Sequence, residues 1–66
     1  AVNVELVINR AGAHDVKIID LNGRILYSWT TTSMVEQVNI SDLASGVYLV
    51  EISQSGAHTV IRLAVD

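Results

Sequence analysis

The chain of 66 residues contains no cysteine and no proline, and aromatic residues make up only 5% of it. Without cysteine no disulfide can support so small a domain, which buries only about 60% of the surface that its unfolded chain exposes. The lack of cysteine fits either redox compartment, so it does not locate the protein. Half of the residues are hydrophobic, which predicts one small folded domain rather than a disordered segment.

Positive charge is also scarce. The net charge is −3, and the four lysine and arginine residues are scattered singly along the chain. We therefore expect no nucleic-acid partner and no attachment to anionic lipid, because neither a basic patch nor a polybasic segment exists. No apolar run approaches the roughly 20 residues of a transmembrane helix, and residues 1–8 lack the basic leader of a signal peptide. We expect a single domain, residues 1–66, cut from the end of a longer protein, with no transmembrane segment.

Alternation of apolar and polar residues, the signature of β-strands, recurs along the chain. It predicts six strands, at residues 2–9, 15–18, 24–29, 37–40, 47–53 and 59–65. Four of the five connections between them contain a glycine. Parallel strands would need helical crossovers, for which the chain has no room. The fold expected is therefore all-β, a small antiparallel immunoglobulin-like β-sandwich of about six or seven strands.

Several turns and connections carry more specific predictions. Asn22 and Gly23 predict a two-residue type I′ hairpin, in which both residues have positive φ. Leu43 and Tyr48 bracket a turn that resembles the tyrosine corner, in which a Tyr hydroxyl fastens a crossover between two sheets. Residues 30–33 fit a linker, an edge strand or both. Residues 33–36 match a helix capping box, but no amphipathic helix follows them.

No pattern in the sequence indicates catalysis, and we expect neither a cofactor nor a metal. His14 and His58 lie near turns and are interpreted as solvated strand-end residues rather than ligands. The stretch 20–23 faintly resembles a calcium loop, but it lacks the later oxygen ligands. No serine lies in a nucleophile elbow. Tyr27 and Trp29 alternate in step with Ile25, which favours a shared core face over an exposed platform for sugars.

Three segments together resemble one family, the C-terminal sorting domains of the type IX secretion system of Bacteroidetes. Residues 16–26 are similar to its V-x-I-Y-D-L-x-G-R-x-V hairpin, residues 38–50 to I-D-L-S-x-L-A-x-G-V-Y-x-V, and residues 56–65 to its closing G…x-x-K-L-x-V strand. The order and spacing of the segments also fit, over most of residues 14–65. The usual opening Y-P-N-P is missing, and the chain ends in Asp66 where many members end in a basic residue.

The resemblance implies a non-catalytic export signal that follows a cargo domain in the same chain. The cargo would pass through the periplasm, and the type IX translocon and its outer-membrane shuttle protein would recognise the signal. The cargo would then reach the outer-membrane surface or be secreted, and a sortase-like protease commonly removes the domain. The positions that the motifs imply, as builders of the fold or points of recognition, are Asp20, Gly23, Arg24, Leu43, Gly46, Tyr48, Leu63, Ala64, Val65 and Asp66.

A physical hypothesis for recognition is that residues 59–65 form an edge strand that a partner extends by strand addition. Deleting residues 63–66 is then expected to abolish export, although the same strand could simply complete the core. Dimerisation is also compatible with an apolar strand in so small a domain. Two other functions remain open, a carbohydrate-binding module and a structural spacer appended to a secreted enzyme. A sorting signal must lie at the C-terminal end of its parent chain, whereas the other two can lie anywhere.

Overall fold

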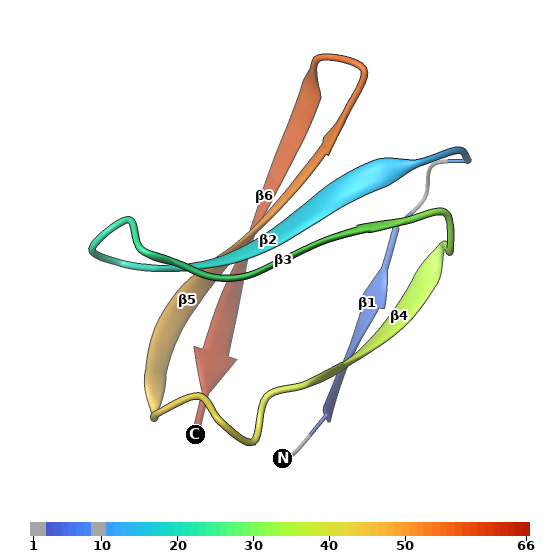
Figure 1. Cartoon of the computed structure of the whole chain (residues 1–66). Coiled ribbons are helices and arrows are strands. Elements are labelled where there is room, and N and C mark those ends of the chain that lie inside the picture. The colour runs from blue at the N-terminus through green and yellow to red at the C-terminus, as the bar shows by residue number, and fades with distance from the viewer. Residues whose placement is uncertain (1–2, 9–10) are drawn as a thin grey trace.

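The structure is a computed structural model that describes residues 3–8 and 11–66. These residues form two antiparallel sheets, as predicted for a small all-β sandwich (Figure 1). One sheet pairs β1 with β4, and the other has the order β3-β2-β5-β6. The strands are β1 (Asn3–Val7), β2 (His14–Asp20), β3 (Ile25–Thr31), β4 (Val35–Asn39), β5 (Gly46–Gln54) and β6 (Ala57–Val65). Val2 of the first predicted strand, and Asn9 and Arg10 beyond its last apolar residue, lie outside the described residues.

The core lies between the two sheets and follows from the alternation in each strand. Successive side chains of a strand point to opposite faces, so every second residue of the central strands faces the other sheet. In the middle of β2 and β5 these residues are apolar and buried, and Leu6 of β1 and Ile8 just after it contribute from the other side. The buried apolar residues are Leu6, Ile8, Val16, Ile18, Ile40, Tyr48, Val50, Ile52 and Val65.

The connection between β3 and β4 was the most ambiguous part of the sequence. Thr30 and Thr31 complete β3, which is an edge of the larger sheet, so the edge-strand interpretation of this run is correct for them. Val35 and Glu36, which the capping box placed at a helix start, begin β4 instead. Tertiary pairing decides the outcome, because Val35 lies opposite Val7 and Glu36 lies opposite Leu6 in an antiparallel ladder.

The predicted face of β3 is wrong at its first residue. Ile25 is 53% exposed, whereas Leu26, Tyr27 and Trp29 pack against the core. The cause is a shift in register: Ile18 lies opposite Tyr27, but Ile19 lies opposite Ile25. The extra residue, Leu26, interrupts the alternation, so the side chains on either side of this β-bulge, Ile25 and Tyr27, lie on opposite faces. Period-two reasoning cannot locate such an insertion.

The turn at Asn22 and Gly23 is a hairpin, as predicted, but not of type I′. Gly23 has a φ of 86°, whereas the only non-glycine residue with positive φ among the described residues is Ser55. The Gly23 amide donates to the Asp20 carbonyl at 3.1 Å, which closes a turn centred on Leu21 and Asn22. This is the longer hairpin in which a glycine of positive φ follows an ordinary turn. The two-residue hairpin occurs instead at Ser55 and Gly56, with φ of 48° and 84°.

The predicted tyrosine corner is confirmed. β4 belongs to the small sheet and β5 to the large one, so residues 40–45 cross from one to the other. The Tyr48 hydroxyl donates a hydrogen bond of 2.6 Å to the Ala44 carbonyl within that crossover. Its ring is buried in the core, and Leu43 packs against the same cluster. The bond therefore fastens the crossover to the strand that follows it.

Replacing Tyr48 by phenylalanine is expected to lower the free energy of unfolding by about 1 kcal/mol, because it removes this hydrogen bond and keeps the ring. Urea unfolding followed by circular dichroism measures the change. Tyr27→Phe is the matched control, since no hydrogen bond to its hydroxyl is found among the described residues. Equal effects of the two substitutions would contradict the role assigned to the corner.

Candidate functional site

Strand register brings the three sequence motifs to one end of the larger sheet. Asp20, Tyr48 and Leu63 come from different motifs, yet they form one row across β2, β5 and β6. Next to this row Val47 lies opposite Ala64, and one residue further along Gly46 lies opposite Val65. We call this region the motif end of the sheet, defined by Asp20, Gly23, Arg24, Leu43, Gly46, Tyr48, Leu63, Ala64 and Val65. Asp66 follows β6 directly and is exposed.

The hairpin part of the motif end is organised by one carboxylate. Oδ1 of Asp20 accepts hydrogen bonds from the backbone amides of Asn22 and Arg24, each 2.9 Å long. Gly23 between them needs its positive φ, which other residues adopt only with strain. The side chain of Arg24 is exposed. Asp20 and Gly23 therefore shape the turn, and Arg24 is the member of this group that projects into solvent.

Replacing Asp20 by alanine is expected to destabilise the domain by about 1–2 kcal/mol, because two backbone amides lose their acceptor. Asp20→Asn keeps an oxygen in the same place and is expected to recover most of the loss. Thermal unfolding of the two variants beside the parent chain measures the difference. If alanine and asparagine cost the same, the capping role of the Asp20 oxygen is wrong.

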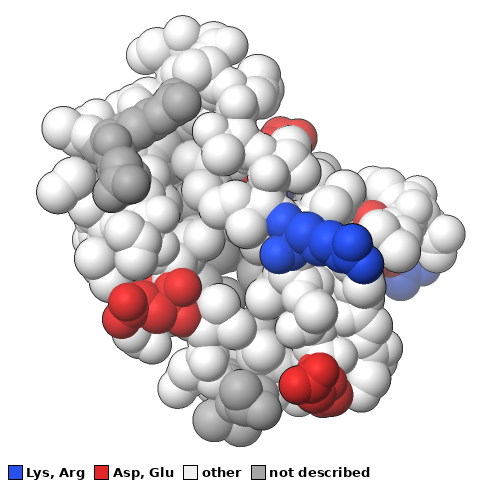
Figure 2. All heavy atoms as spheres, turned by 180° about the vertical axis from the view of Figure 1, so that it is seen from behind, with Lys and Arg blue, Asp and Glu red and all other residues white. Residues whose placement is uncertain are grey.

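The last strand combines buried and exposed residues at the motif end. Val65 is buried and Leu63 packs against the core, whereas Arg62 and Ala64 are exposed. β6 is an edge strand of the sheet (Figure 1). It carries two exposed large apolar residues, Val60 and Ile61. Figure 2, which views the molecule from the opposite side, shows its charged side chains as separate groups among uncharged atoms. Edge strands are usually protected by charge or proline. β6 has no proline, and apart from His58 its one charged side chain is Arg62.

The hairpin at Ser55 and Gly56 determines which backbone groups of β6 are unpaired. Gln54 and Ala57 flank this two-residue loop, and such flanking residues exchange both of their hydrogen bonds. In an antiparallel ladder the bonded pairs then recur at every second residue. The amides and carbonyls that point away from β5, toward the free edge, are therefore those of His58, Val60, Arg62 and Ala64.

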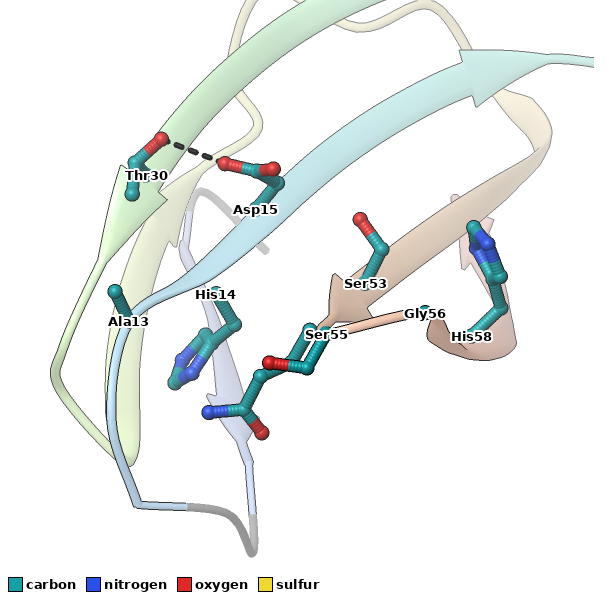
Figure 3. Close-up of a pocket in the computed structure, with 9 residues that line it drawn as sticks. Ala13, His14, Asp15, Thr30, Ser53, Ser55, Gly56 and His58 are labelled. Carbon is teal, nitrogen blue, oxygen red and sulfur yellow. Dashed lines mark hydrogen bonds between the residues drawn. The ribbon is translucent and has the colours of Figure 1, made fainter.

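The two histidines do not form a joint site. His58 is exposed, as expected, but His14 is only 2% exposed, so its interpretation as a solvated residue is wrong. Its Nε2 lies 3.1 Å from the Ser33 carbonyl, whereas its Nδ1 is buried without a partner. Both rings border one cavity of about 340 Å³, but they lie apart and point in different directions (Figure 3). No group of three metal-binding side chains occurs in the described part of the chain.

The alternative of an exposed aromatic platform for sugars receives little support. Tyr27 and Trp29 are each half-buried and pack against the core cluster, as predicted from their alternation. Stacking on a sugar ring requires an exposed aromatic face. Their main role is therefore structural.

Comparison with known proteins decides the family. The profile of the secretion system C-terminal sorting domain matches residues 1–66, the whole chain. The chain belongs to this family. The type IX sorting domain is an export signal for a cargo in the same chain, which it directs through the secretion system to the cell surface or the medium. No curated protein and no solved structure matches the chain. The described residues form no helix that is long and apolar enough to cross a membrane.

Two features of the domain were not anticipated from the sequence. The burial of His14 gave no signal, because histidine as a residue type is intermediate in its tendency to be buried. The register shift between β2 and β3 also gave no clear signal in the sequence. The one available hint was Leu26, an apolar residue at a position that strict alternation assigns to the solvent face.

Proposed function

We propose that the outer-membrane translocon recognises this sorting domain by adding a strand to the free edge of β6. The observation that carries the proposal is the nine-residue edge strand with Val60 57% and Ile61 38% exposed. Backbone groups at every second residue of such an edge give affinity to an added strand, and the alternate side chains give selectivity. The neighbouring motif end, which includes the exposed Arg24, supplies further contacts to the partner.

The remaining steps of the proposal follow the family. The domain lies at the C-terminal end of a longer protein, and its cargo passes through the periplasm. The outer-membrane shuttle protein receives the domain together with the translocon, and a sortase-like protease removes it from the cargo. The domain itself catalyses nothing and carries no cofactor. Of its motif residues, Gly23, Gly46 and Tyr48 build the fold, and the exposed Arg24, Ala64 and Asp66 are points of contact.

A reporter fusion tests the function directly. Residues 1–66 are joined to the C-terminus of a reporter that carries a Sec signal peptide, in a bacterium that has the type IX translocon. The reporter is expected at the cell surface or in the medium, and the same reporter without residues 1–66 is expected in the periplasm. Equal retention of both reporters, with the fused domain intact, would contradict the proposed function.

A further inference from the structure

A groove of about 360 Å³ lies between β3 and β4, where the two sheets do not close over each other. Tyr27 and Trp29 of β3 form one wall, and Glu36, Gln37, Val38 and Asn39 of β4 form the other. β3 is an edge of the larger sheet and β4 is an edge of the smaller one. The two-stranded sheet is too narrow to cover the whole inner face of the four-stranded sheet. The groove lies at the β3 edge of the larger sheet, on the side away from β6.

The free edge of β4 has a defined set of unpaired backbone groups. The Ile8 amide donates to the Met34 carbonyl at 2.6 Å, and the register places these two residues opposite each other. Bonded pairs recur at every second residue of an antiparallel ladder, so the backbone groups of Glu36 and Val38 point toward β1. Those of Val35, Gln37 and Asn39 point away from β1, and Gln37 and Asn39 line the groove.

Glu36 gives the groove its charge. It lies opposite Leu6, which is buried, so its side chain is on the inner face of the small sheet beside Tyr27 and Trp29. It is half-buried, and no hydrogen bond or ion pair joins it to another described residue. A half-buried carboxylate is stabilised by a cation, and aromatic rings beside it favour the same charge.

We propose that this groove binds an extended polypeptide segment, which adds to β4 as a third strand and places a lysine or arginine against Glu36. The backbone groups of Val35, Gln37 and Asn39 repeat at about 6.8 Å, the spacing of alternate residues in a strand. The same alternation sets the sequence of the partner. Its inward side chains are one basic residue facing Glu36 and apolar residues over Trp29, and its outward side chains are free to vary. This site is separate from the β6 edge and does not depend on export.

Trp29 is the only tryptophan of the chain and lines the groove, so its fluorescence responds to binding there. The probe is a synthetic seven-residue peptide without tryptophan, in which valine and one central lysine alternate with threonine. Titration of the 66-residue chain is expected to shift the Trp29 emission saturably. A peptide with glutamate in place of the lysine is expected to bind at least about fivefold more weakly at low salt. Equal binding of the two peptides would overturn the assignment to Glu36.

Amide hydrogen exchange distinguishes strand addition from other modes of binding. The amides of Val35, Gln37 and Asn39 are expected to gain protection in the complex, while those of Glu36 and Val38 are already protected by β1. An emission shift without this pattern would refute the added strand. A shift with a soluble oligosaccharide but not with the peptide would refute the choice of a polypeptide partner.

Matched variants separate the backbone from the side chains. Gln37→Pro removes a donor that faces the free edge, where proline is tolerated, and is expected to abolish binding. Gln37→Ala keeps that donor and is expected to bind like the parent chain, although it loses the Gln37–Glu5 hydrogen bond. Glu36→Gln is expected to remove the preference for lysine over glutamate while the chain stays folded by circular dichroism. Unchanged binding by folded Gln37→Pro, or an unchanged preference in Glu36→Gln, would overturn the proposal.

Discussion

Secretion of a cargo whose sorting domain carries Val60→Pro is expected to fall about tenfold or more, because the edge of β6 loses a donor and gains a bulky ring. The Val60 amide points away from β5, so the substitution leaves the hydrogen bonds within the sheet in place, and proline is tolerated on such an edge. The side chain of Val60 is 57% exposed, and its loss leaves no cavity. The measurement is the ratio of secreted to cell-associated reporter.

Two controls make this result specific to the edge. Val60→Ala keeps the backbone donor and is expected to be secreted at close to the parent level. Circular dichroism of isolated Val60→Pro is expected to show the β-sheet spectrum of the parent chain. Normal secretion of folded Val60→Pro would sink the hypothesis that β6 is extended by its partner. Failure of both valine substitutions would assign the effect to the side chain instead.

The structure also explains why deletion of residues 63–66 is the weaker test. Val65 is buried and Leu63 packs against the core, so the deletion removes two residues on which the fold depends. Loss of export after that deletion could come from unfolding or from loss of the recognised edge, and an export assay alone does not separate the two. A single change at an outward-facing edge position avoids this problem, since the backbone groups of Val60 take no part in the pairing with β5.

Much of this fold could be predicted because local patterns and tertiary packing agree. In β5, Tyr48, Val50 and Ile52 alternate with less buried residues. The paired strand β2 shows the same alternation, so the buried faces of both strands meet in the core. The corner between Leu43 and Tyr48 was predictable because the ring, the hydroxyl and the turn lie within six residues of sequence. Short-range chemistry of this kind leaves a signature that survives in a single sequence.

The wrong predictions have their physical origin in contacts that the alternation of a single strand does not report, some of them local and some between distant segments. The bulge opposite Ile19 depends on how β3 is paired with β2, and the sequence of β3 alone permits either face. The type of the turn after Asp20 depends on two amides that its carboxylate captures. The burial of His14 depends on the Ser33 carbonyl, 19 residues away. The candidate groove likewise exists only because two edge strands of different sheets lie side by side.

Replacing Ile18 by alanine is expected to destabilise the domain by about 3–4 kcal/mol, which is a large part of its stability. A chain of this length has a total stability of only about 3–10 kcal/mol. Ile18 is 1% exposed, and the apolar gap that it borders holds only about 10 Å³. The core is thus already close-packed, and its neighbours, held in two hydrogen-bonded ladders, cannot move in to fill the vacated volume.

Ile25→Ala is the matched control, because it makes the same chemical change on the adjacent strand at a side chain that is 53% exposed. Its expected effect is within about 0.5 kcal/mol of zero. Urea unfolding of the two variants measures the contrast, and equal losses would mean that the register shift, and with it the inner face assigned to β3, is wrong. Export should follow the same order, since an edge strand offers regularly spaced donors only while the sheet beneath it is folded. Ile18→Ala is therefore expected to lose secretion together with its fold, whereas Val60→Pro loses secretion while it stays folded.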